Sequence, residues 1–376
     1  MSEWSLVYEA YEPACETHRE ALCALGNGYF VTRGAAPDCS ADGLHYPGSY
    51  VAGGYNRLVS RVAQRDVENE DLVNLPNWLV LRIRIDDDAW LSPDQVELLS
   101  YRQELDLKAG LLQRRLRLRD RAGRITRWDE RRLVSMADRH LAALELQVTP
   151  EDWAGRLSIC AGIDGGVIND GVARYRGLSS RHLETVATGE QDACTVFLQA
   201  RLNQARVEIA EVVRTCLWLN REPIGPPRRT EQSADRIAQE IALDVRADDE
   251  VSIEKVLALF TSRDRAISEA GLAARHSAAR APRFEDLLGS TAAFGDSCGS
   301  SATSTSPPRR IGRSSPSCGS IFSISCRACR TTPSISTSAC RRAAGTAKRI
   351  AGTSSGTSCS SCPISTCACL RSAGRC

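Results

Sequence analysis

The sequence predicts a mainly β protein: a large antiparallel β-sandwich, then a short helical linker and a disordered tail. Apolar and polar residues alternate with a period of two in many segments of residues 1–260, which is the pattern of half-buried strands. Turn-forming residues separate these segments, and a helical pattern is recognisable only after residue 262. Many short strands with turns between them favour a sandwich over a helical fold.

The strand pattern is clearest at residues 78–87, WLVLRIRIDD. One predicted face is aliphatic and the other carries arginines: Leu79, Leu81, Ile83 and Ile85 lie opposite Val80, Arg82 and Arg84. Residues 111–128 alternate leucine with arginine, break at 120–123 and resume at Ile125, which predicts a hairpin with its turn at Ala122 and Gly123. We interpret the arginines of residues 114–132 as the solvated face of this sheet.

The remaining segments complete the predicted domain order. Strand-like patterns follow at 144–148, 156–163, 194–202, 206–213, 237–245 and 251–260. Residues 262–288 combine helix formers with charged residues at helical spacing, interrupted by Pro282. The prediction is therefore a sandwich over 1–260, a helical linker over 261–290 and a tail over 291–376.

Charge divides the 376-residue chain into two unlike parts, although its formal net charge is only +2. Residues 1–296 carry 37 basic and 46 acidic side chains, whereas the last 80 carry 11 basic residues and no carboxylate. The negative balance of the first part opposes binding to a phosphate backbone, so no nucleic-acid partner is expected. No apolar run approaches the roughly 18 residues of a membrane helix and no signal peptide is recognisable, so we expect no membrane partner, a cytoplasmic location and unpaired cysteines.

Aromatic, amide and glycine residues cluster early, at LGNGYFVTRG (25–34), YPGSYVAGGYNR (46–57) and LVNLPNWL (72–79). Aromatic faces cover the C–H patches of sugars while amides pair with hydroxyls, so this composition suits sugar recognition. Tight turns between strands require the same residue types, and that alternative stays open. No nucleophile–base arrangement can be recognised, so no catalytic residue is predicted.

Metal binding is not predicted either. The five histidines show no metal-ligand spacing and are interpreted as surface or structural residues: His18, His45, His140, His182 and His276. The run Asp86, Asp87 and Asp88 is interpreted as a turn at a strand end, not as an acid–base pair.

The order of several segments resembles the N-terminal part of family 65 glycoside hydrolases. The resemblance runs from about residue 4 to 288 and rests on ALGNGYFVTRG, YPGSYVAGGYNR, LVNLPNWL, RRLVSMADRHLAALELQVTPEDWAG, GIDGGVINDGV and VLALFTSRDRAI. It implies a galactose-mutarotase-like super-sandwich followed by a helical linker and an (α/α)6 barrel that holds the active site. The motifs match the family at six candidate substrate-binding residues: Tyr29, Tyr50, Tyr55, Asn56, Asn77 and Trp78.

The family relationship implies activity on α-linked glucose disaccharides such as trehalose, maltose and kojibiose. Its phosphorylases invert the anomeric carbon with one barrel glutamate and with inorganic phosphate as co-substrate, whereas inverting hydrolysis needs a second carboxylate. Because the acid–base residues belong to the barrel, we expect a truncated chain without turnover. Dimers occur in the family, so a homodimer is one expected assembly. A non-catalytic sugar-binding or subunit-interaction module is the alternative.

The tail has two interpretations. Its last 80 residues hold 21 serines and 10 cysteines, a composition typical of disorder. In the first interpretation, the pairs Cys326/Cys329 and Cys359/Cys362 matter, because they have the spacing of a zinc ribbon. In the second interpretation, the tail is translated in a shifted reading frame. A GC-rich coding sequence for residues 344–359, read one nucleotide out of register, can encode GWHGEAYRGHIFWDEL. This string is similar to a barrel segment of the family. Residues 291–300 and 325–345 permit barrel-like strings in the same order, which predicts a frameshift near residues 289–291 and makes the cysteine pairs accidental.

Overall fold

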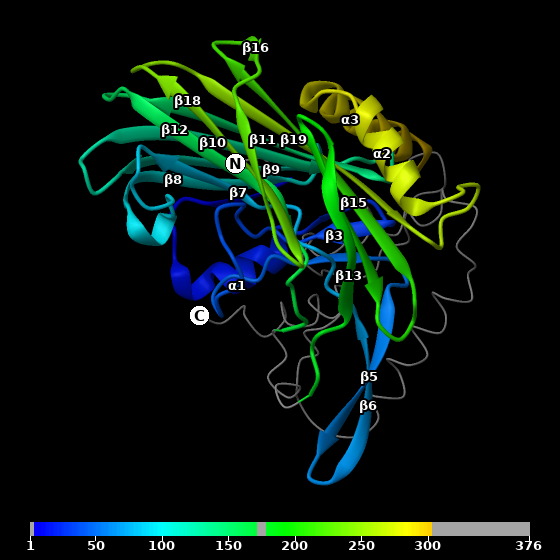
Figure 1. The fold of residues 1–376 in the computed structure, drawn as a ribbon. Helices are drawn as coiled ribbons and strands as arrows, with labels where there is room; N and C mark the ends of the chain where they lie inside the picture. The colour runs from blue at the N-terminus through cyan, green and yellow to red at the C-terminus, as the bar shows by residue number, and fades with distance from the viewer. Residues whose placement is uncertain (1–3, 171–177, 303–376) are drawn as a thin grey trace, which may run out of the picture. The chain divides into compact units, whose positions relative to one another are not determined.

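The predicted strands pair into two large antiparallel sheets that pack face to face (Figure 1). The computed structural model describes residues 4–170 and 178–302, with side chains up to residue 294. In these ranges the larger sheet has ten strands, in the order β1 (Ser5–Tyr8), β8 (Glu97–Asp106), β9 (Leu111–Arg119), β10 (Ile125–Val134), β11 (Leu141–Pro150), β19 (Val251–Thr261), β15 (Glu208–Leu219), β14 (Thr195–Leu202) and β13 (Leu183–Asp192), with β16 (Glu222–Ile224) paired to β15. The second sheet is β17 (Arg228–Gln232), β18 (Arg236–Val245), β12 (Gly155–Asp164) and β7 (Leu81–Ile85).

Smaller elements complete the described part. A three-stranded sheet is formed by β2 (Leu25–Gly26), β3 (Phe30–Thr32) and β4 (Ser49–Val51), and a separate hairpin by β5 (Tyr55–Val62) and β6 (Arg65–Leu72). The helices are α1 (Pro13–Leu22), the 3-10 turn η1 (Pro93–Gln95), α2 (Ala270–Arg280) and α3 (Phe284–Ala302). The mainly β sandwich is confirmed, and β9 and β10 form the predicted hairpin around residues 120–124.

Burial on both faces explains why seven of the eleven residues of β19 are apolar. All eleven of its residues are buried, because one face lies in the main core between the sheets and the other lies under α2 and α3. The helix α2 can approach closely because Ala270, Ala274 and Ala278 recur every four residues on its buried side. Pro282 separates α2 from α3, as the sequence predicted, and α3 continues to Ala302, beyond the expected end of the linker at residue 290.

Two expectations were wrong. A helix precedes residue 262: α1 begins with Pro13 at its first turn and buries Glu16, Arg19 and Glu20. Its buried face is charged, so apolar periodicity could not reveal it. The arginines of residues 114–132 are also not all solvated, because Arg114 and Arg132 are buried on the inner face of the larger sheet.

Some narrower predictions concern the described residues and others lie outside them. Asp86, Asp87 and Asp88 form a turn and bend directly after β7, as expected. The described cysteines are all free, with Cys23, Cys39 and Cys160 buried and Cys15 exposed. Among the described residues, no helix is long and apolar enough to cross a bilayer. The tail beyond residue 302, with its cysteine pairs, lies outside the described residues.

Candidate functional site

Three of the six predicted site residues are buried and hold the fold together. Trp78 is fully buried in the main core and therefore presents no ring face to a ligand. Asn77 bridges to Asp164 through reciprocal backbone hydrogen bonds of 2.7 and 3.1 Å. The Asn56 side chain donates a hydrogen bond to the Asn203 side chain at 2.7 Å. Its oxygen accepts hydrogen bonds from two backbone N–H groups in the turn that follows Asn203.

The three tyrosines lie in different surroundings. Tyr29 is half-buried and donates its hydroxyl to Asp264 Oδ2 at 2.5 Å, and both burial and that carboxylate raise the pKa of Tyr29. Burial likewise raises the pKa of Tyr50 well above its ordinary value, with Tyr46 beside it. Tyr55 is exposed at the start of β5. None of the six lines the open pocket described below, and the sugar-binding role of the tyrosines stays a prediction.

The motifs that carried the family resemblance meet at one end of β19. The Tyr29 ring lies 4.6 Å from the His140 ring, which stacks on Phe260 at 3.8 Å. Asp264, just after β19, accepts hydrogen bonds from the Tyr29 hydroxyl and from the Thr261 backbone N–H. Distant parts of the sequence are thus joined where the sandwich passes into the linker, which gives Tyr29 a structural role.

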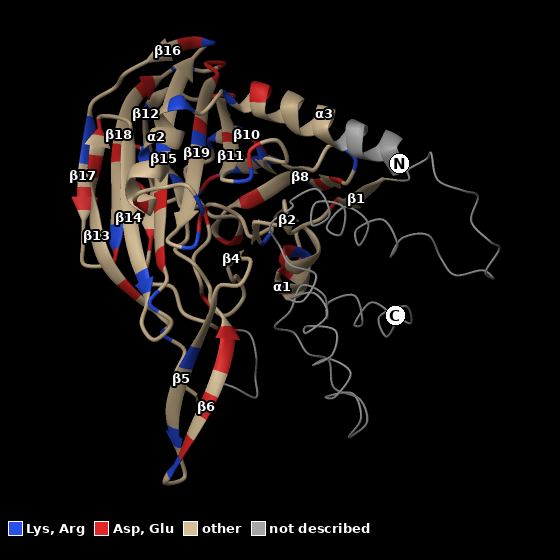
Figure 2. Cartoon of the chain, turned by 90° about the vertical axis from the view of Figure 1, so that its right-hand side faces the viewer, with Lys and Arg blue, Asp and Glu red and all other residues tan. Residues whose placement is uncertain are grey.

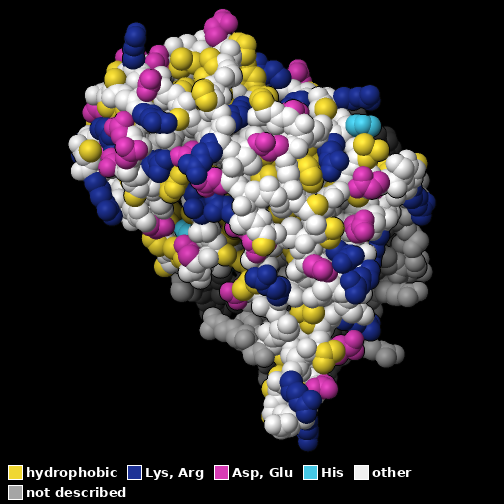
Figure 3. Space-filling view, in the orientation of Figure 1, with side chains coloured by type: hydrophobic (Ala, Val, Ile, Leu, Met, Phe, Trp, Pro, Cys, Tyr) yellow, Lys and Arg dark blue, Asp and Glu magenta, His cyan; other side chains and the backbone are white. Residues whose placement is uncertain are grey.

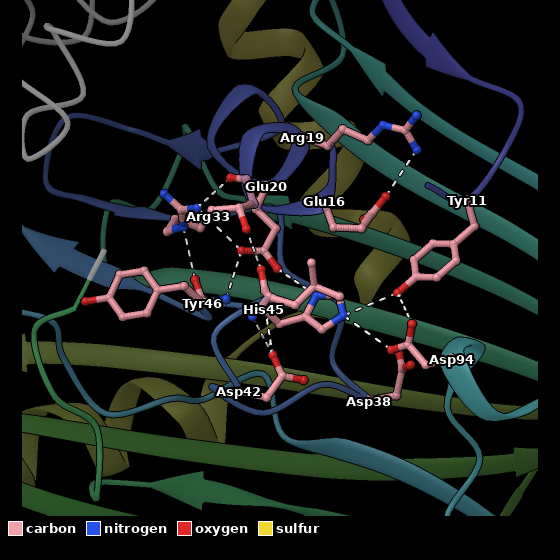
Figure 4. A network of polar contacts seen from close by, with 12 residues as sticks. Tyr11, Glu16, Arg19, Glu20, Arg33, Asp38, Asp42, His45, Tyr46 and Asp94 are labelled. Atoms are coloured by element: carbon pink, nitrogen blue, oxygen red, sulfur yellow. Dashed lines mark hydrogen bonds and ion pairs between the residues drawn. The ribbon is translucent and has the colours of Figure 1, made fainter. Parts of the chain in front are cut away.

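A buried polar network joins α1 to His45 and its neighbours (Figure 4). His45 is almost fully buried, with Nδ1 3.0 Å from Glu20 Oε1 and Nε2 3.3 Å from the Tyr11 hydroxyl and 3.5 Å from Asp94. Burial alone would lower the pKa of His45, but Glu20 and the carboxylates of Asp42 and Asp94 raise it overall. The imidazole can hold a proton here, but it is closed off from solvent, so it joins segments of the chain and is not placed to react with a substrate.

A second part of this buried region surrounds Arg114. Its Nε lies 2.8 Å from Glu130 Oε2, and its Nη2 pairs with Asp38. Period-two alternation did contain this signal, because residue 114 shares its face with Leu112 and Leu116. The charged buried face of α1 had no comparable signal in the sequence.

An open pocket of about 840 Å³ lies at one end of the four-stranded sheet, beside the turn after β7 and the start of β12. It is lined by Asp86, Ala154, Gly155, Arg156, Leu219, Asn220, Asp244, Val245, Arg246 and Asp249. A hydrogen bond from Asn220 lowers the pKa of Asp249, and Asp86 pairs with Arg124 at 2.7 Å. A general acid needs a raised pKa. Among the described carboxyl groups, the raised pKa values belong to Glu16, Asp129, Glu145 and Glu211, none of which lines this pocket.

Within the described residues there is also no group of three or more metal-ligating side chains. Taken together, the described residues define a mainly β domain, in which two antiparallel sheets pack face to face and two helices follow the last strand. The model of the glycosyl hydrolase family 65 N-terminal domain matches residues 6–297, so the chain belongs to glycoside hydrolase family 65 and contains its N-terminal domain.

Relatives agree with this assignment. An uncharacterized glycosyl hydrolase of Mycobacterium tuberculosis is 43% identical over 284 residues, covering 76% of this chain and 21% of the relative. The kojibiose phosphorylase of Caldanaerobacter subterraneus is 28% identical over 268 residues, covering 70% and 33%. The trehalose 6-phosphate phosphorylase of Lactococcus lactis is 28% identical over 261 residues, covering 69% and 32%. The chain thus spans between a fifth and a third of the length of these relatives.

A solved structure assigned as a kojibiose phosphorylase from the human microbiome has the same fold, with a TM-score of 0.67 and 17% identity over 78% of this chain and 37% of the other. At this identity the similarity concerns the fold alone.

Proposed function

We propose that this chain is the sandwich part of an enzyme that cleaves α-glucosidic disaccharides by inverting phosphorolysis or hydrolysis. Relatives named as phosphorylases of kojibiose and trehalose 6-phosphate support phosphorolysis, with inorganic phosphate as co-substrate. The single observation that carries the proposal is the family match over residues 6–297.

The chain by itself is expected to have no turnover. Inverting cleavage requires an acidic group that still holds its proton near neutral pH at a substrate site. The pocket carboxylates Asp86 and Asp249 are paired and hydrogen-bonded, and the pKa of Asp249 is lowered. The carboxyl groups whose pKa is raised, Glu16, Asp129, Glu145 and Glu211, lie away from the pocket, and the family resemblance places the acid–base residues in the barrel.

A phosphate-dependent assay checks this expectation. The purified chain is incubated with phosphate and with kojibiose, trehalose, trehalose 6-phosphate or maltose, and glucose 1-phosphate and free glucose are measured. We expect no product above a no-enzyme control, with a full-length phosphorylase of the family as positive control. Release of either product that rises in proportion to the chain's concentration would contradict the expectation.

The tail over residues 291–376 is proposed to be a frame-shifted read. Two observations support this proposal. The family match ends at residue 297, and no Asp or Glu follows Asp296. Resequencing codons 285–295 tests it, because a frame change there restores barrel-like coding sequence. An uninterrupted frame, with no barrel-coding sequence in another register, would refute it.

Sugar binding without catalysis is the second candidate, favoured by the pocket. Among the described residues, Arg156, Asp244 and Arg246 line it without a hydrogen bond or ion pair to their side chains. Arg156 and Asp244 are direct cross-strand partners, so both lie on one face, where they can bind hydroxyls. Calorimetric titration with kojibiose, trehalose and glucose should show binding that Asp244→Ala weakens and the exposed control Glu231→Ala does not. Absence of heat at millimolar sugar would exclude this candidate.

A further inference from the structure

The polar network of Figure 4 surrounds one buried histidine with acidic groups. Charged side chains are spread over the face of the molecule in Figure 3, where water solvates them. The acidic and basic residues coloured on α1 in Figure 2 include three that are buried, Glu16, Arg19 and Glu20, and Glu20 lies against His45, which is only 3% exposed. A buried imidazole satisfies its two ring nitrogens with protein groups, so the partners of each nitrogen indicate its protonation state.

The partners of His45 Nε2 both accept hydrogen bonds. This nitrogen lies 3.3 Å from the Tyr11 hydroxyl oxygen and 3.5 Å from Asp94 Oδ2. Tyr11 donates its only hydrogen to Asp94 Oδ1 at 2.7 Å, so its oxygen offers the ring only lone pairs. Because Nε2 faces a lone pair and a carboxylate, it fits this place only when it carries a hydrogen.

The partner of Nδ1, on the other side of the ring, is also an acceptor. Glu20 Oε1 lies 3.0 Å from Nδ1. The second oxygen of Glu20 accepts hydrogen bonds from the Tyr46 backbone N–H at 3.0 Å and from Arg33 Nη2 at 3.4 Å, as expected of a carboxylate. A neutral imidazole has one N–H, so a ring with acceptors at both nitrogens is satisfied only as an imidazolium.

The surrounding charges favour the extra proton. Charged and titratable groups come from every element that packs near the ring, and carboxylates outnumber guanidinium groups: Glu16 and Glu20 on α1, Asp38 and Asp42 between β3 and β4 and Asp94 on η1, against Arg19 on α1, Arg33 after β3 and Arg114 on β9, with Tyr11 before α1. Burial alone would lower the pKa of His45, but the hydrogen bond to Glu20 and the nearby carboxylates raise it overall. A positive charge on His45 thus reduces the excess of buried negative charge.

We propose that His45 is a proton-operated clamp between α1 and η1. As an imidazolium, the ring donates from Nδ1 to Glu20 on α1 and holds Asp94 on η1 from its other side. When Nε2 gives its proton to water, the link to η1 is lost and the link to α1 remains.

The hydroxyl of Tyr11 explains why the η1 side opens. Its single hydrogen can be donated to Asp94 or to a deprotonated Nε2, but not to both. Once Tyr11 turns to Nε2, Asp94 has lost both partners, and its side chain, which is 35% exposed, turns to water. The His45 backbone stays in place, because Asp42 Oδ1 accepts its N–H at 2.7 Å and the Asp42 N–H donates to its C=O at 3.3 Å.

The pH dependence of the clamp has a defined sign. Because the pKa of His45 is raised in the native protein, the clamp contributes its full stability below the pKa of an unfolded histidine, about 6.5. This contribution is lost as the pH rises through the raised native pKa. The clamp is therefore closed in mildly acidic solution and open in alkaline solution.

Nitrogen NMR of the whole chain with isotope-labelled histidine tests the charge state. The two ring nitrogens of an imidazolium have similar chemical shifts, whereas those of a neutral tautomer are far apart, and the signal that disappears in His45→Gln identifies His45. We expect an imidazolium near neutral pH, with a titration midpoint above that of the same residue in the urea-unfolded chain. Asp94→Asn should lower this midpoint, because it removes one carboxylate. The matched control Asp87→Asn removes an exposed carboxylate from the same connection between β7 and β8 and should leave the midpoint unchanged.

Hydrogen exchange followed by mass spectrometry tests the release of η1. After correction for the intrinsic pH dependence of exchange, a peptide spanning residues 90–97 should exchange several-fold faster above the His45 midpoint than below it. In His45→Gln, whose new side chain does not titrate, this step should be absent. His18→Gln replaces an exposed histidine of α1 and should keep the step.

If circular dichroism shows that His45→Gln does not fold, Asp94→Asn takes its place, because its lower midpoint should move the exchange step to lower pH. A neutral ring near neutral pH, a midpoint that Asp94→Asn leaves unchanged, or an exchange step that persists in a folded His45→Gln would each overturn the proposal.

Discussion

Arg114→Met should lower the free energy of unfolding by about 3–5 kcal/mol, the usual cost of breaking a buried ion pair from one side. Arg114 lies between Asp38 and Glu130, and the side chains of all three are at most 6% exposed. Methionine fills a similar volume but leaves both carboxylates buried without their main cation. Urea unfolding monitored by tryptophan fluorescence would measure the loss.

Arg115→Met is the matched control for this effect. Arg115 is the next residue on β9, its side chain is 59% exposed, and it lies 3.8 Å from Asp129. An exposed pair of this kind contributes at most about 1 kcal/mol. Adding Asp38→Asn and Glu130→Gln to Arg114→Met should restore part of the lost stability, because the uncompensated charges disappear. Equal losses for the Arg114 and Arg115 variants, or no recovery in the triple variant, would show that the buried charges do not cause the effect.

Glu211→Met should raise the free energy of unfolding near neutral pH by about 1–3 kcal/mol. Glu211 is fully buried on β15, and neither of its carboxylate oxygens has a hydrogen-bond partner among the described residues. Burial raises the pKa of Glu211 well above its ordinary value, although Lys255 opposes this. The native protein therefore either holds a proton there or buries an unpaired charge, and methionine removes that cost.

The sign of the pH dependence follows from the raised pKa. Below the pKa of an unfolded glutamate, the carboxyl group is protonated in both states and costs nothing through ionisation. As the pH rises from there through the raised native pKa, the unfolded chain releases its proton first, so the wild type loses stability. The advantage of Glu211→Met should thus grow as the pH rises above about 4 and through the raised native pKa. Glu208→Met, at the exposed start of the same strand, is the control. A pH-independent difference between wild type and Glu211→Met would contradict the assignment.

Much of the sandwich could be predicted because half-buried strands show a local alternation of apolar and polar residues. The strands β7, β9–β12, β14, β15, β18 and β19 all coincide with segments whose pattern was visible. The hairpin β5–β6 was missed, since its residues are mostly exposed and polar on both faces. The sugar-binding role of the candidate site residues stays a prediction. Aromatic and amide residues in turns have the same composition whether they bind a ligand or hold the chain, and in the structure Asn56, Asn77 and Trp78 hold the chain.

The amino-acid order alone determined the β class, the hairpin at residues 120–124, the helical linker and the family, because each depends on neighbours within about ten residues or on the succession of motifs. Only the tertiary structure decided which partners the buried charges have. Alternation along β9 placed Arg114 on the leucine face, but its carboxylate partners come from distant segments, and the burial of His45 and Glu211 also depends on which segments pack over them. Whether a charge is paired or isolated in the interior is a property of that packing, and local sequence patterns do not show it.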